Sequence, residues 1–467
     1  MKRTKIVCTL GPASDSVATV EKLIKSGMNV ARLNLSHNTL EYHGRLIKTV
    51  RTAARATGEP AAILLDLQGP RIRIGDLGDK IVNLKIGQNI ILTEDVDYSK
   101  AGDKKIIPVA FANFSEAVKP GQRILIADGL IELKVKSIEN EKIHCETMNG
   151  GAVSSHKGIN LPDTAVKIPS LTEKDKKDLA FGLKNGVDYV GLSFVSDAND
   201  VNELRSLINK LDKNPVPAKI IVKIERKAAI DNIDEIIEAA DGVMVARGDL
   251  GIELPEEDVP LMQKMIIDKC LHAAKPVIVA TQMLDSMINN PRPTRAEVSD
   301  VANAVIDHTD AVMLSGETAN GKYPVEATEM MKKIIVETEN SVYDNLVLQD
   351  KVKKIIPASE AIGLVAKTLS ENSKAKLILA DAASEHTARI VSRYRPEMPI
   401  LVSCANERSE RQLNLSWGIA PFVLLKTKDP KESLAKSMAY AKKKKLAKAG
   451  DKIIVATDNS VEVKAIG

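Results

Sequence analysis

Residues Lys219–Glu225 read KIIVKIE and residues Asp241–Pro255 read DGVMVARGDLGIELP, with a segment of helical pattern between them. Each stretch holds an apolar run typical of a strand buried on both faces, and each run stops at charged residues. The carboxyl ends of parallel strands are where an α/β protein exposes its chemistry. Glu225 and Asp249 at neighbouring strand ends, with Lys223 beside them, indicate a divalent ion next to a cation that holds a phosphate. The pattern predicts phosphoryl transfer.

Six further apolar, β-branched runs alternate with helical segments along the chain. The eight strands expected in this way are Lys5–Leu10, Asn29–Leu35, Ala61–Leu67, Tyr189–Val195, Lys219–Glu225, Gly242–Arg247, Pro276–Gln282 and Asp310–Leu314. Eight parallel strands with helical crossovers specify a closed (β/α)8 barrel, the TIM barrel. Val17–Ser26 is expected to be the first crossover helix, with Ser14 or Ser16 as its cap and Gly27 at its end.

The interval between the third and fourth expected strands is much longer than the others. Within it, residues 80–93 and 123–145 alternate polar and apolar side chains and are separated by glycines, which predicts short strands joined by turns. We expect a small all-β domain over residues 71–166. It is inserted in a loop on the catalytic face, where it can act as a lid. The barrel then comprises residues 1–70 and 167–344.

Residues 345–467 are expected to form a separate C-terminal three-layer α/β domain, with the linker inside residues 351–357. Helical and strand patterns alternate there as in a doubly wound sheet. The expected elements are Glu360–Leu369, Lys376–Ala380, Glu385–Arg393, Pro399–Cys404, Leu434–Lys443 and Lys452–Ala456.

Composition excludes several classes of function. The net charge is +4 among 66 basic and 62 acidic residues, so no nucleic acid or other polyanion is expected as the main partner. The basic run Lys442–Lys445 is expected to be a solvated helix face. No apolar run is long enough for a signal peptide or a membrane helix. The four cysteines show no metal-binding spacing and indicate a reducing compartment, so a cytoplasmic location is expected.

Eight segments of the chain resemble the pyruvate kinase family, in family order and over essentially the whole length. Each lies at an expected barrel strand end or just after it. The segments are KIVCTLGPAS (Lys5–Ser14), MNVARLNLSH (Met28–His37), LDLQGPRIRIG (Leu65–Gly75), IVKIE (Ile221–Glu225), GVMVARGDLGIELP (Gly242–Pro255), ATQMLDSM (Ala280–Met287), PRPTRAEVSDVANAV (Pro291–Val305) and MLSGETANGKYP (Met313–Pro324). The family architecture is a barrel with an inserted β domain and a C-terminal α/β domain, as the patterns above also predict.

The resemblance implies transfer of phosphate from phosphoenolpyruvate to ADP, which gives ATP and an enolate that is protonated to pyruvate. It implies Mg²⁺, for which Mn²⁺ can substitute, held by Glu225 and Asp249; magnesium commonly takes one or two carboxylates. Lys223 then stabilises the transferring phosphoryl group. Arg32 and Arg73 are the other phosphate cations of the family, and Arg73 also faces the nucleotide.

The remaining site residues also follow from the resemblance. Gly248 and Asp249 begin a short helix, and their backbone N–H groups bind the substrate carboxylate. Thr281 hydrogen-bonds that carboxylate and lies near the carbon that takes the proton; the donor is its hydroxyl or a relayed water. Asn34 and His37 approach the nucleotide.

A monovalent-cation site in the family comprises residues equivalent to Asn34, Ser36, Asp66 and the carbonyl of Leu67. Potassium-dependent members read Asp-Thr-Lys-Gly-Pro-Glu there, whereas this chain reads Asp-Leu-Gln-Gly-Pro-Arg and ends at Arg71. Arg71 supplies fixed positive charge where those members have a glutamate, so K⁺ independence is predicted. The alternative is that Arg71 points to solvent.

Three further segments bear on nucleotide binding, regulation and assembly. Ser196-Asp197 stands where many relatives have a basic residue that contacts ADP, which puts that one contact in doubt. In the stretch 382–387, Glu385 replaces a glycine of the family's sugar-phosphate effector loop, so activation by fructose 1,6-bisphosphate is not expected; AMP or another phosphorylated metabolite stays open as the allosteric effector. Arg292, Thr294 and Arg295 resemble the subunit-contact segment of a homotetramer.

Two other functions fit part of this pattern. A barrel lyase that stabilises a pyruvate enolate with Mg²⁺ would share the metal ligands, but it needs neither a nucleotide clamp nor an inserted lid. A metabolite sensor could keep the fold and lose the chemistry. The presence of every assigned catalytic side chain, Arg73 and Lys223 included, favours the kinase.

Overall fold

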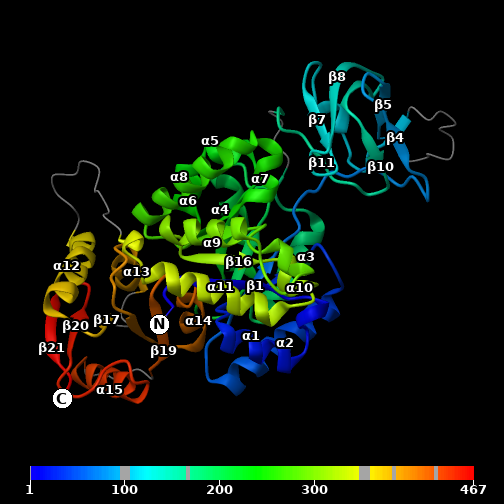
Figure 1. Cartoon of the computed structure of the whole chain (residues 1–467). Helices are drawn as coiled ribbons and strands as arrows, with labels where there is room; N and C mark the ends of the chain where they lie inside the picture. The colour runs from blue at the N-terminus through cyan, green and yellow to red at the C-terminus, as the bar shows by residue number, and fades with distance from the viewer. Residues whose placement is uncertain (1, 95–105, 165–168, 346–357, 381–384, 425–429) are drawn as a thin grey trace.

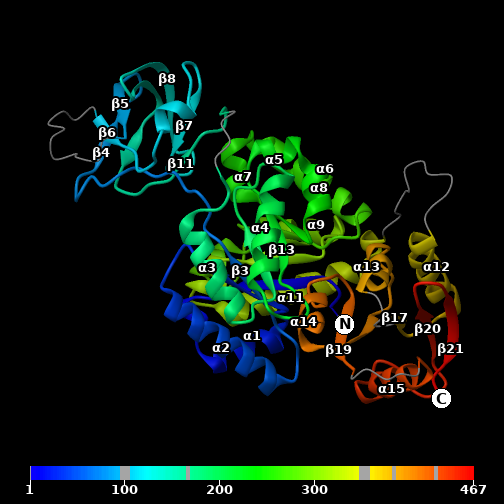
Figure 2. The ribbon, with the colours of Figure 1, turned by 180° about the vertical axis from the view of Figure 1, so that it is seen from behind.

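The computed structural model describes residues 2–94, 106–164, 169–345, 358–380, 385–424 and 430–467. A barrel lies in the middle of the molecule, with an all-β body at one end and an α/β body at the other (Figure 1). Turning the molecule by 180° shows the same arrangement, with the all-β body joined to the barrel by the chain segments around β3 and β11 (Figure 2). The expected fold class is confirmed.

The central body is a closed barrel of eight parallel strands. Their order is β1-β16-β15-β14-β13-β12-β3-β2, and neighbouring strands pair in parallel. All eight predicted strands are present, each within one to three residues of its expected ends. They are β1 (Lys5–Thr9), β2 (Val30–Asn34), β3 (Ala62–Asp66), β12 (Tyr189–Leu192), β13 (Lys219–Ile224), β14 (Gly242–Ala246), β15 (Val277–Ala280) and β16 (Ala311–Leu314).

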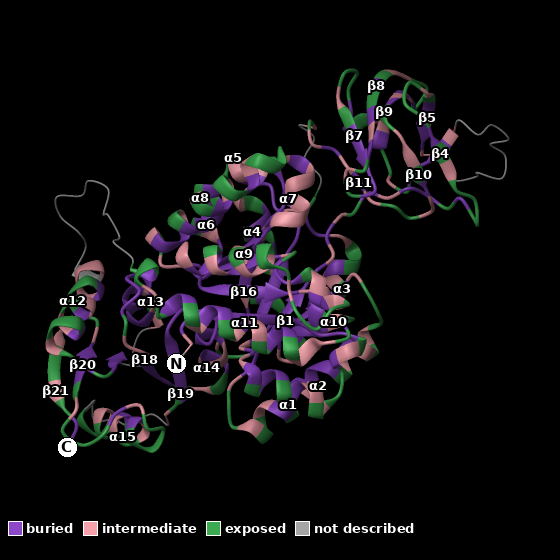
Figure 3. Cartoon of the chain, viewed as in Figure 1, coloured by how far each residue is buried: buried purple, intermediate pink, exposed green. Residues whose placement is uncertain are grey.

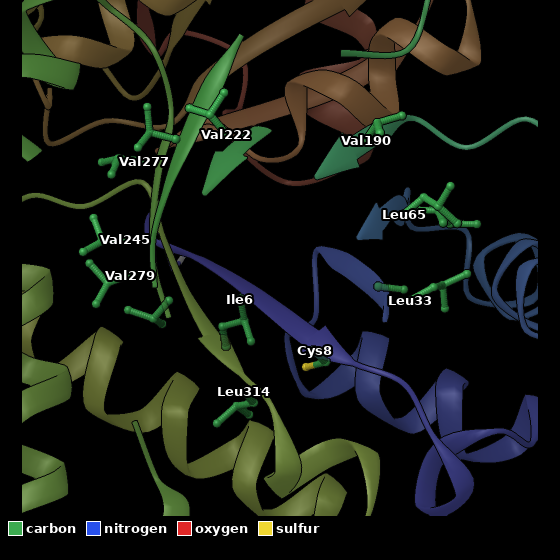
Figure 4. Packing of buried hydrophobic residues seen from close by; sticks show 14 of the residues in the cluster. Ile6, Cys8, Leu33, Leu65, Val190, Val222, Val245, Val277, Val279 and Leu314 are labelled. Carbon is green, nitrogen blue, oxygen red and sulfur yellow. The ribbon is translucent and has the colours of Figure 1, made fainter. Parts of the chain in front are cut away.

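Side chains alternate across the barrel wall. One set, including Val7, Leu64 and Met244, fills the interior. The other set lies between the strands and the surrounding helices; Ile6, Val222 and Val279 are among its members (Figure 4). Because both faces of each strand are covered by protein, the strands read as continuous apolar runs rather than alternating ones. In Figure 3 the barrel strands are accordingly buried along their length.

Helices cover the outside of the barrel. They are α1 (Val17–Ser26), α2 (Leu40–Thr57), α3 (Glu173–Lys184), α4 (Ala198–Leu211), α5 (Lys227–Asp231), α6 (Ile233–Ala239), α7 (Arg247–Glu253), α8 (Val259–His272), α9 (Arg295–Ile306), α10 (Gly316–Ala319) and α11 (Pro324–Glu339). The first helix has the predicted bounds. Ser16 caps it by accepting a hydrogen bond from the Thr19 backbone N–H at 3.1 Å, and Gly27 ends it at φ 119°.

The all-β body between β3 and β12 is called the β module here, meaning the elements β4 to β11. They are β4 (Val82–Leu84), β5 (Asn89–Thr93), β6 (Ile106–Pro108), β7 (Arg123–Ile126), β8 (Ile131–Glu139), β9 (Lys142–Asn149), β10 (Gly151–Val153) and β11 (Ile159–Asn160). They form a six-stranded sheet, β11-β7-β8-β9-β5-β6, and the pair β10-β4, around a separate hydrophobic core. The insertion is thus all-β, while its limits at residues 71 and 166 stay predictions.

The C-terminal body holds a five-stranded sheet in the order β19-β18-β17-β20-β21. Its strands are β17 (Ile378–Ala380), β18 (Ile400–Cys404), β19 (Ile419–Val423), β20 (Lys452–Ala456) and β21 (Val461–Ala465), and its helices are α12 (Ala358–Ser373), α13 (Glu385–Arg393), α14 (Glu407–Leu413) and α15 (Pro430–Lys443). One core lies against α12, α13 and α14, and a second lies against α15, so the domain has three layers. The predicted linker, residues 351–357, lies outside the described residues.

Two smaller predictions are also answered. The side chains of Lys442–Lys445 are exposed at the end of α15, as a solvated face should be. All four cysteines are free and buried, and burial raises the pKa of the Cys8 thiol to about 12, which makes it unreactive. Within the described part of the chain, no helix has the length and apolar character that crossing a membrane would require.

Candidate active site

Helices α5 and α7 begin where β13 and β14 end, and both lie at the end of the barrel that faces the β module (Figures 1 and 2). The turn between β7 and β8 approaches this end closely: a Cβ atom at Gly129 would lie 3.7 Å from the side chain of Ile252 in α7. The β module therefore stands over the carboxyl ends of the barrel strands, where TIM barrels carry their chemistry.

Lys223 is the centre of the charged cluster at these strand ends. Its Nζ atom lies 2.6 Å from Oε1 of Glu225 and 3.6 Å from Oδ1 of Asp66. It also donates a hydrogen bond to the hydroxyl of Ser193 at 2.9 Å. Burial alone would lower the pKa of Lys223, but the charges of Asp66 and Glu225 outweigh burial and raise that pKa above its usual value. The side chain is an ammonium ion at neutral pH.

Arg32, in the middle of β2, provides a second buried cation. Its Nε donates to Oδ2 of Asp66 at 2.8 Å, and its Nη1 donates to the hydroxyl of Thr9 at 3.0 Å. Asp66 is only 1% exposed and lies between the two cations Arg32 and Lys223. A carboxylate held in this way fixes the direction of both positive side chains without solvent competing for them.

The two carboxylates expected to hold a metal are close enough to influence each other. Glu225 is 2% exposed, and its Oε2 accepts a hydrogen bond from the Phe194 backbone N–H at 2.8 Å. Burial, together with the negative charge of Asp249, raises the pKa of Glu225 above its usual value. A buried carboxylate whose charge is disfavoured by burial and by a second carboxylate fits a magnesium ion, which prefers oxygen ligands and commonly takes one or two carboxylates.

No cluster of three or more His, Cys, Asp or Glu side chains suited to a metal occurs among the described residues. The expected ligands Glu225 and Asp249 would supply two carboxylates rather than a closed protein cage. This is the pattern expected of Mg²⁺, which usually leaves several positions for water and substrate oxygens.

Gly248 and Thr281, both expected at the substrate carboxylate, contact each other directly. The Gly248 backbone N–H donates to Oγ1 of Thr281 at 2.9 Å, and that hydroxyl donates to the carbonyl of Ala280 at 2.6 Å. Thr281 has φ 72°, which for a β-branched residue is a strained conformation of the kind that clusters at functional sites. The strain was not foreseeable from the sequence.

Arg71, in the segment after β3, lies with its Nη2 3.4 Å from Oδ1 of Asp249, although the side chain is 36% exposed. It therefore reaches toward the site as well as toward solvent. Arg73 is further away, and its Nη1 donates to the carbonyl of His156 in the β module at 2.8 Å. Burial, followed by the charge of Arg71, lowers the pKa of Arg73. Arg73, which also forms an isolated bridge with Gly158, thus lies within the β module.

The residues expected at a monovalent cation take part in hydrogen bonds or ion pairs within the protein. The side-chain oxygen of Asn34 accepts from the Ser36 N–H at 3.1 Å. The Leu67 carbonyl accepts the hydroxyl of Ser193 at 2.7 Å, and the same Ser193 receives the hydrogen bond from Lys223. The exposed His37 follows this segment, and its carbonyl lies 2.8 Å from Nε2 of His43.

Sequence reasoning missed three residues that support the cluster. Ser193, Thr9 and Phe194 bind Lys223, Arg32 and Glu225 respectively. All three lie at or just beyond a barrel strand end, so position relative to the predicted strands was a usable signal. Their hydrogen bonds to particular partners were not predictable from it.

The segments expected to regulate or assemble the protein lie elsewhere. Residues 382–384 of the expected effector stretch are outside the described residues. Glu385, the first described residue of α13, pairs with Lys219 and lies 3.8 Å from Arg389. Arg292 and Arg295 are exposed, and Thr294 caps α9.

Comparison with known proteins gives consistent results. The family described as "Pyruvate kinase, barrel domain" matches residues 1–328, and "Pyruvate kinase, alpha/beta domain" matches residues 360–465. A pyruvate kinase of Sporosarcina psychrophila is 44% identical over the whole of this chain and 81% of its own length. One of Clostridium acetobutylicum is 42% identical over 98% of this chain and 96% of its own. A crystal structure of a pyruvate kinase from Cryptosporidium parvum superposes with a TM-score of 0.95 at 37% identity, covering 100% of this chain and 96% of that one.

Proposed function

This chain belongs to the pyruvate kinase family, the phosphotransferases that make pyruvate and ATP from phosphoenolpyruvate and ADP, and from that premise we propose which part of the reaction each of its residues carries out. The observation that carries the proposal is the position of the Lys223 ammonium, 2.6 Å from Glu225 and close to Asp66 at the mouth of the barrel. A phosphoryl group transferred there meets fixed positive charge in a site where water competes little.

Lys223 and Arg32 hold the phosphoryl group. Both are cations at neutral pH, and both are aimed by Asp66, so they need little reorganisation when negative charge moves during transfer. Ser193 fixes the remaining freedom of Lys223 by accepting one of its three N–H bonds. The lysine thus presents its free donor toward the substrate rather than toward its own strand.

Glu225 and Asp249 would hold Mg²⁺, for which Mn²⁺ can substitute. When bound, the ion supplies a divalent charge that neutralises phosphate and enolate oxygens. Glu225 is held in place for this role by the Phe194 N–H and by Lys223. Its burial keeps the carboxylate from turning into solvent.

The substrate carboxylate is bound at the start of α7 by the N–H groups of Gly248 and Asp249. Thr281 completes this subsite. In the structure the Gly248 N–H is already paired with the Thr281 hydroxyl, so substrate binding exchanges one hydrogen bond for another. The hydroxyl, or a water that it holds, then delivers a proton to the enolate carbon.

The nucleotide is bound between the barrel and the β module, by Arg73 with Asn34 and His37. Arg73 supports this position through its bond to the β module at the His156 carbonyl. A β module that moves toward the barrel would carry Arg73 to the phosphates and exclude water from the reaction.

The monovalent-cation site of Asn34, Ser36, Asp66 and Leu67 is not required in this proposal. Arg71 contributes a fixed charge beside Asp249, and the Leu67 carbonyl already accepts a hydrogen bond from Ser193. The enzyme is proposed to work without K⁺. It is further proposed to be a cytoplasmic homotetramer, with the exposed Arg292 and Arg295 at a subunit contact, and to respond to AMP or another phosphorylated metabolite.

A coupled assay tests the proposed reaction. Purified enzyme with phosphoenolpyruvate, ADP and Mg²⁺ should form ATP and pyruvate in equal amounts, and chelation of the metal should stop both. Pyruvate formed together with inorganic phosphate and without ATP would identify hydrolysis of phosphoenolpyruvate instead. Absence of both products in a folded preparation would contradict the proposal.

A further inference from the structure

Arg247, the first residue of α7, contacts the strained backbone next to the proposed substrate subsite. Its Nη2 donates to the carbonyl of Thr281 at 2.7 Å and lies 3.4 Å from the carbonyl of Gln282. Both of these residues have positive φ, 72° and 53°. One guanidinium therefore binds the backbone at the point where the chain leaves β15 in a conformation that non-glycine residues rarely adopt.

The guanidinium is itself fixed by a carboxylate. Its Nη1 lies 2.7 Å from Oδ1 of Asp300 and its Nη2 lies 2.7 Å from Oδ2, a bidentate pair with a residue of α9. The side chain of Arg247 is 13% exposed. The planar guanidinium can bind the Asp300 carboxylate and the Thr281 carbonyl at the same time, whereas the ammonium group of a lysine could bind only one of them in this geometry.

We propose that Arg247 is a positioning residue for proton transfer: by holding the carbonyl of Thr281, it keeps that residue at positive φ with its hydroxyl directed at Gly248. The inference rests on the proposed function. Arg247 touches no reacting atom in this account. It acts through Thr281, whose Oγ1 lies 2.9 Å from the Gly248 N–H.

The physical reason is that the strained conformation must be held by its surroundings. Without the bond to its carbonyl, Thr281 can relax toward the extended backbone of the strand that precedes it. The hydroxyl then moves away from Gly248 and from the position proposed for the enolate. Misplacement of about 1 Å can cost on the order of 100-fold in rate.

The step affected is the formation of one C–H bond. The electron pair of the enolate C=C bond takes a proton at the methylene carbon, and the C–O⁻ bond becomes the ketone C=O. Run backwards, the same step removes a methyl proton from pyruvate. An enzyme that makes pyruvate must therefore also exchange the methyl protons of pyruvate with solvent.

The experiment measures that exchange. Wild type and Arg247→Lys are incubated with pyruvate, Mg²⁺ and ATP in D₂O, and the loss of the methyl ¹H signal is followed by NMR. We expect exchange in Arg247→Lys to be slower on the order of 100-fold, with the KM for ADP in the forward reaction unchanged. Asp300→Asn should slow exchange less, and the double variant should be no slower than Arg247→Lys, because the two act as one unit.

Arg205 in α4 is a matched control. Its Nη2 likewise binds a backbone carbonyl, that of Ala239 at 2.7 Å, and a carboxylate, that of Asp241 at 3.0 Å, away from the site. Arg205→Lys should exchange at the wild-type rate. Exchange in Arg247→Lys close to wild type, or an equal loss in Arg205→Lys, would overturn the inference. If Arg247→Lys does not fold, wild-type exchange in Asp300→Asn would overturn it. A wild type that forms no ATP would instead contradict the proposed function.

Discussion

The guanidinium of Arg71 lies 3.4 Å from the carboxylate of Asp249, so a cation from the segment after β3 faces a proposed metal ligand at the start of α7. Both side chains are partly exposed, which makes the pair weak as a source of stability. The pair matters because of its position, since Arg71 adds positive charge at the edge of the proposed phosphate site.

The first prediction concerns potassium. Adding K⁺ should change the rate of the wild type less than about twofold, because Arg71 already supplies the positive charge. The ionic strength is kept constant so that screening by the salt does not change. Arg71→Glu should be slow without K⁺ and recover with it, since a negative charge now needs a counter-ion. Arg71→Gln is the control for loss of the side chain alone. Strong K⁺ activation of the wild type would refute the idea.

Lys223→Met should lower kcat by roughly 100- to 1,000-fold, the usual cost of removing one preorganised charge stabiliser. The nearby Lys227→Met is the matched control, because the side chain of Lys227 is exposed and pairs with Asp231 one turn along α5. It should keep full activity. Loss of Lys223 leaves Glu225 without its cation and Asp66 with Arg32 alone, so circular dichroism and thermal melting are needed to show that both variants fold. A Lys223→Met enzyme of near wild-type kcat would remove this residue from the mechanism.

Asp188 should be important for stability rather than chemistry. It is fully buried and accepts hydrogen bonds from Arg51 and Arg411, each at 2.8 Å, so it joins the barrel to the C-terminal domain. Asp188→Ala leaves two arginines without their partner and should cost about 3–5 kcal/mol. Urea unfolding measures this, with the exposed Asp231→Ala as control at well under 1 kcal/mol. Equal losses in the two variants would contradict the assignment.

Lys5 predicts a dependence of stability on pH. It is buried, its Nζ donates to the carbonyl of Ile419 at 2.6 Å, and burial lowers its pKa to about 8. The unfolded chain has a lysine pKa of about 10.4 and thus binds more protons than the native state between the two values, so stability rises with pH across that window. Lys5→Met should lose this rise. Unfolding curves at pH 7 and pH 10 for both proteins measure it; parallel pH profiles would contradict it.

Much of the fold was predictable because the barrel strands are covered on both faces and therefore read as continuous apolar runs. The ends of β1 and β13 were overestimated by one residue each, since Leu10 and Glu225 are buried without being paired in the barrel. In the C-terminal domain, β19 was missed because Pro421 interrupts its run, as proline does at a sheet edge. Strand β21, at the opposite edge of the same sheet, was also missed.

The gathering of charged side chains at the strand ends was predictable from the sequence, whereas their geometry was not, and their roles stay proposals. Position at strand ends brought Lys223, Glu225 and Asp249 together. Asp66 lies between Arg32 and Lys223 because of the register of adjacent strands. This register cannot be predicted from the pattern of a single sequence. The positive φ of Thr281 and its bond to Arg247 depend on the tertiary surroundings that impose them. Such features lie beyond local sequence preference.

The most direct test of the two-carboxylate metal site is the binding of Mn²⁺, followed by its paramagnetic resonance signal, in wild type and in Glu225→Gln. The substitution keeps the shape of the side chain and removes its charge; Glu253→Gln, a neighbouring carboxylate that pairs with Arg226, is the control. We predict that Glu225→Gln loses Mn²⁺ affinity by at least about 10-fold, as loss of a metal-site partner does, and makes no measurable ATP, while Glu253→Gln keeps both. Undiminished Mn²⁺ binding and turnover in folded Glu225→Gln would contradict the account.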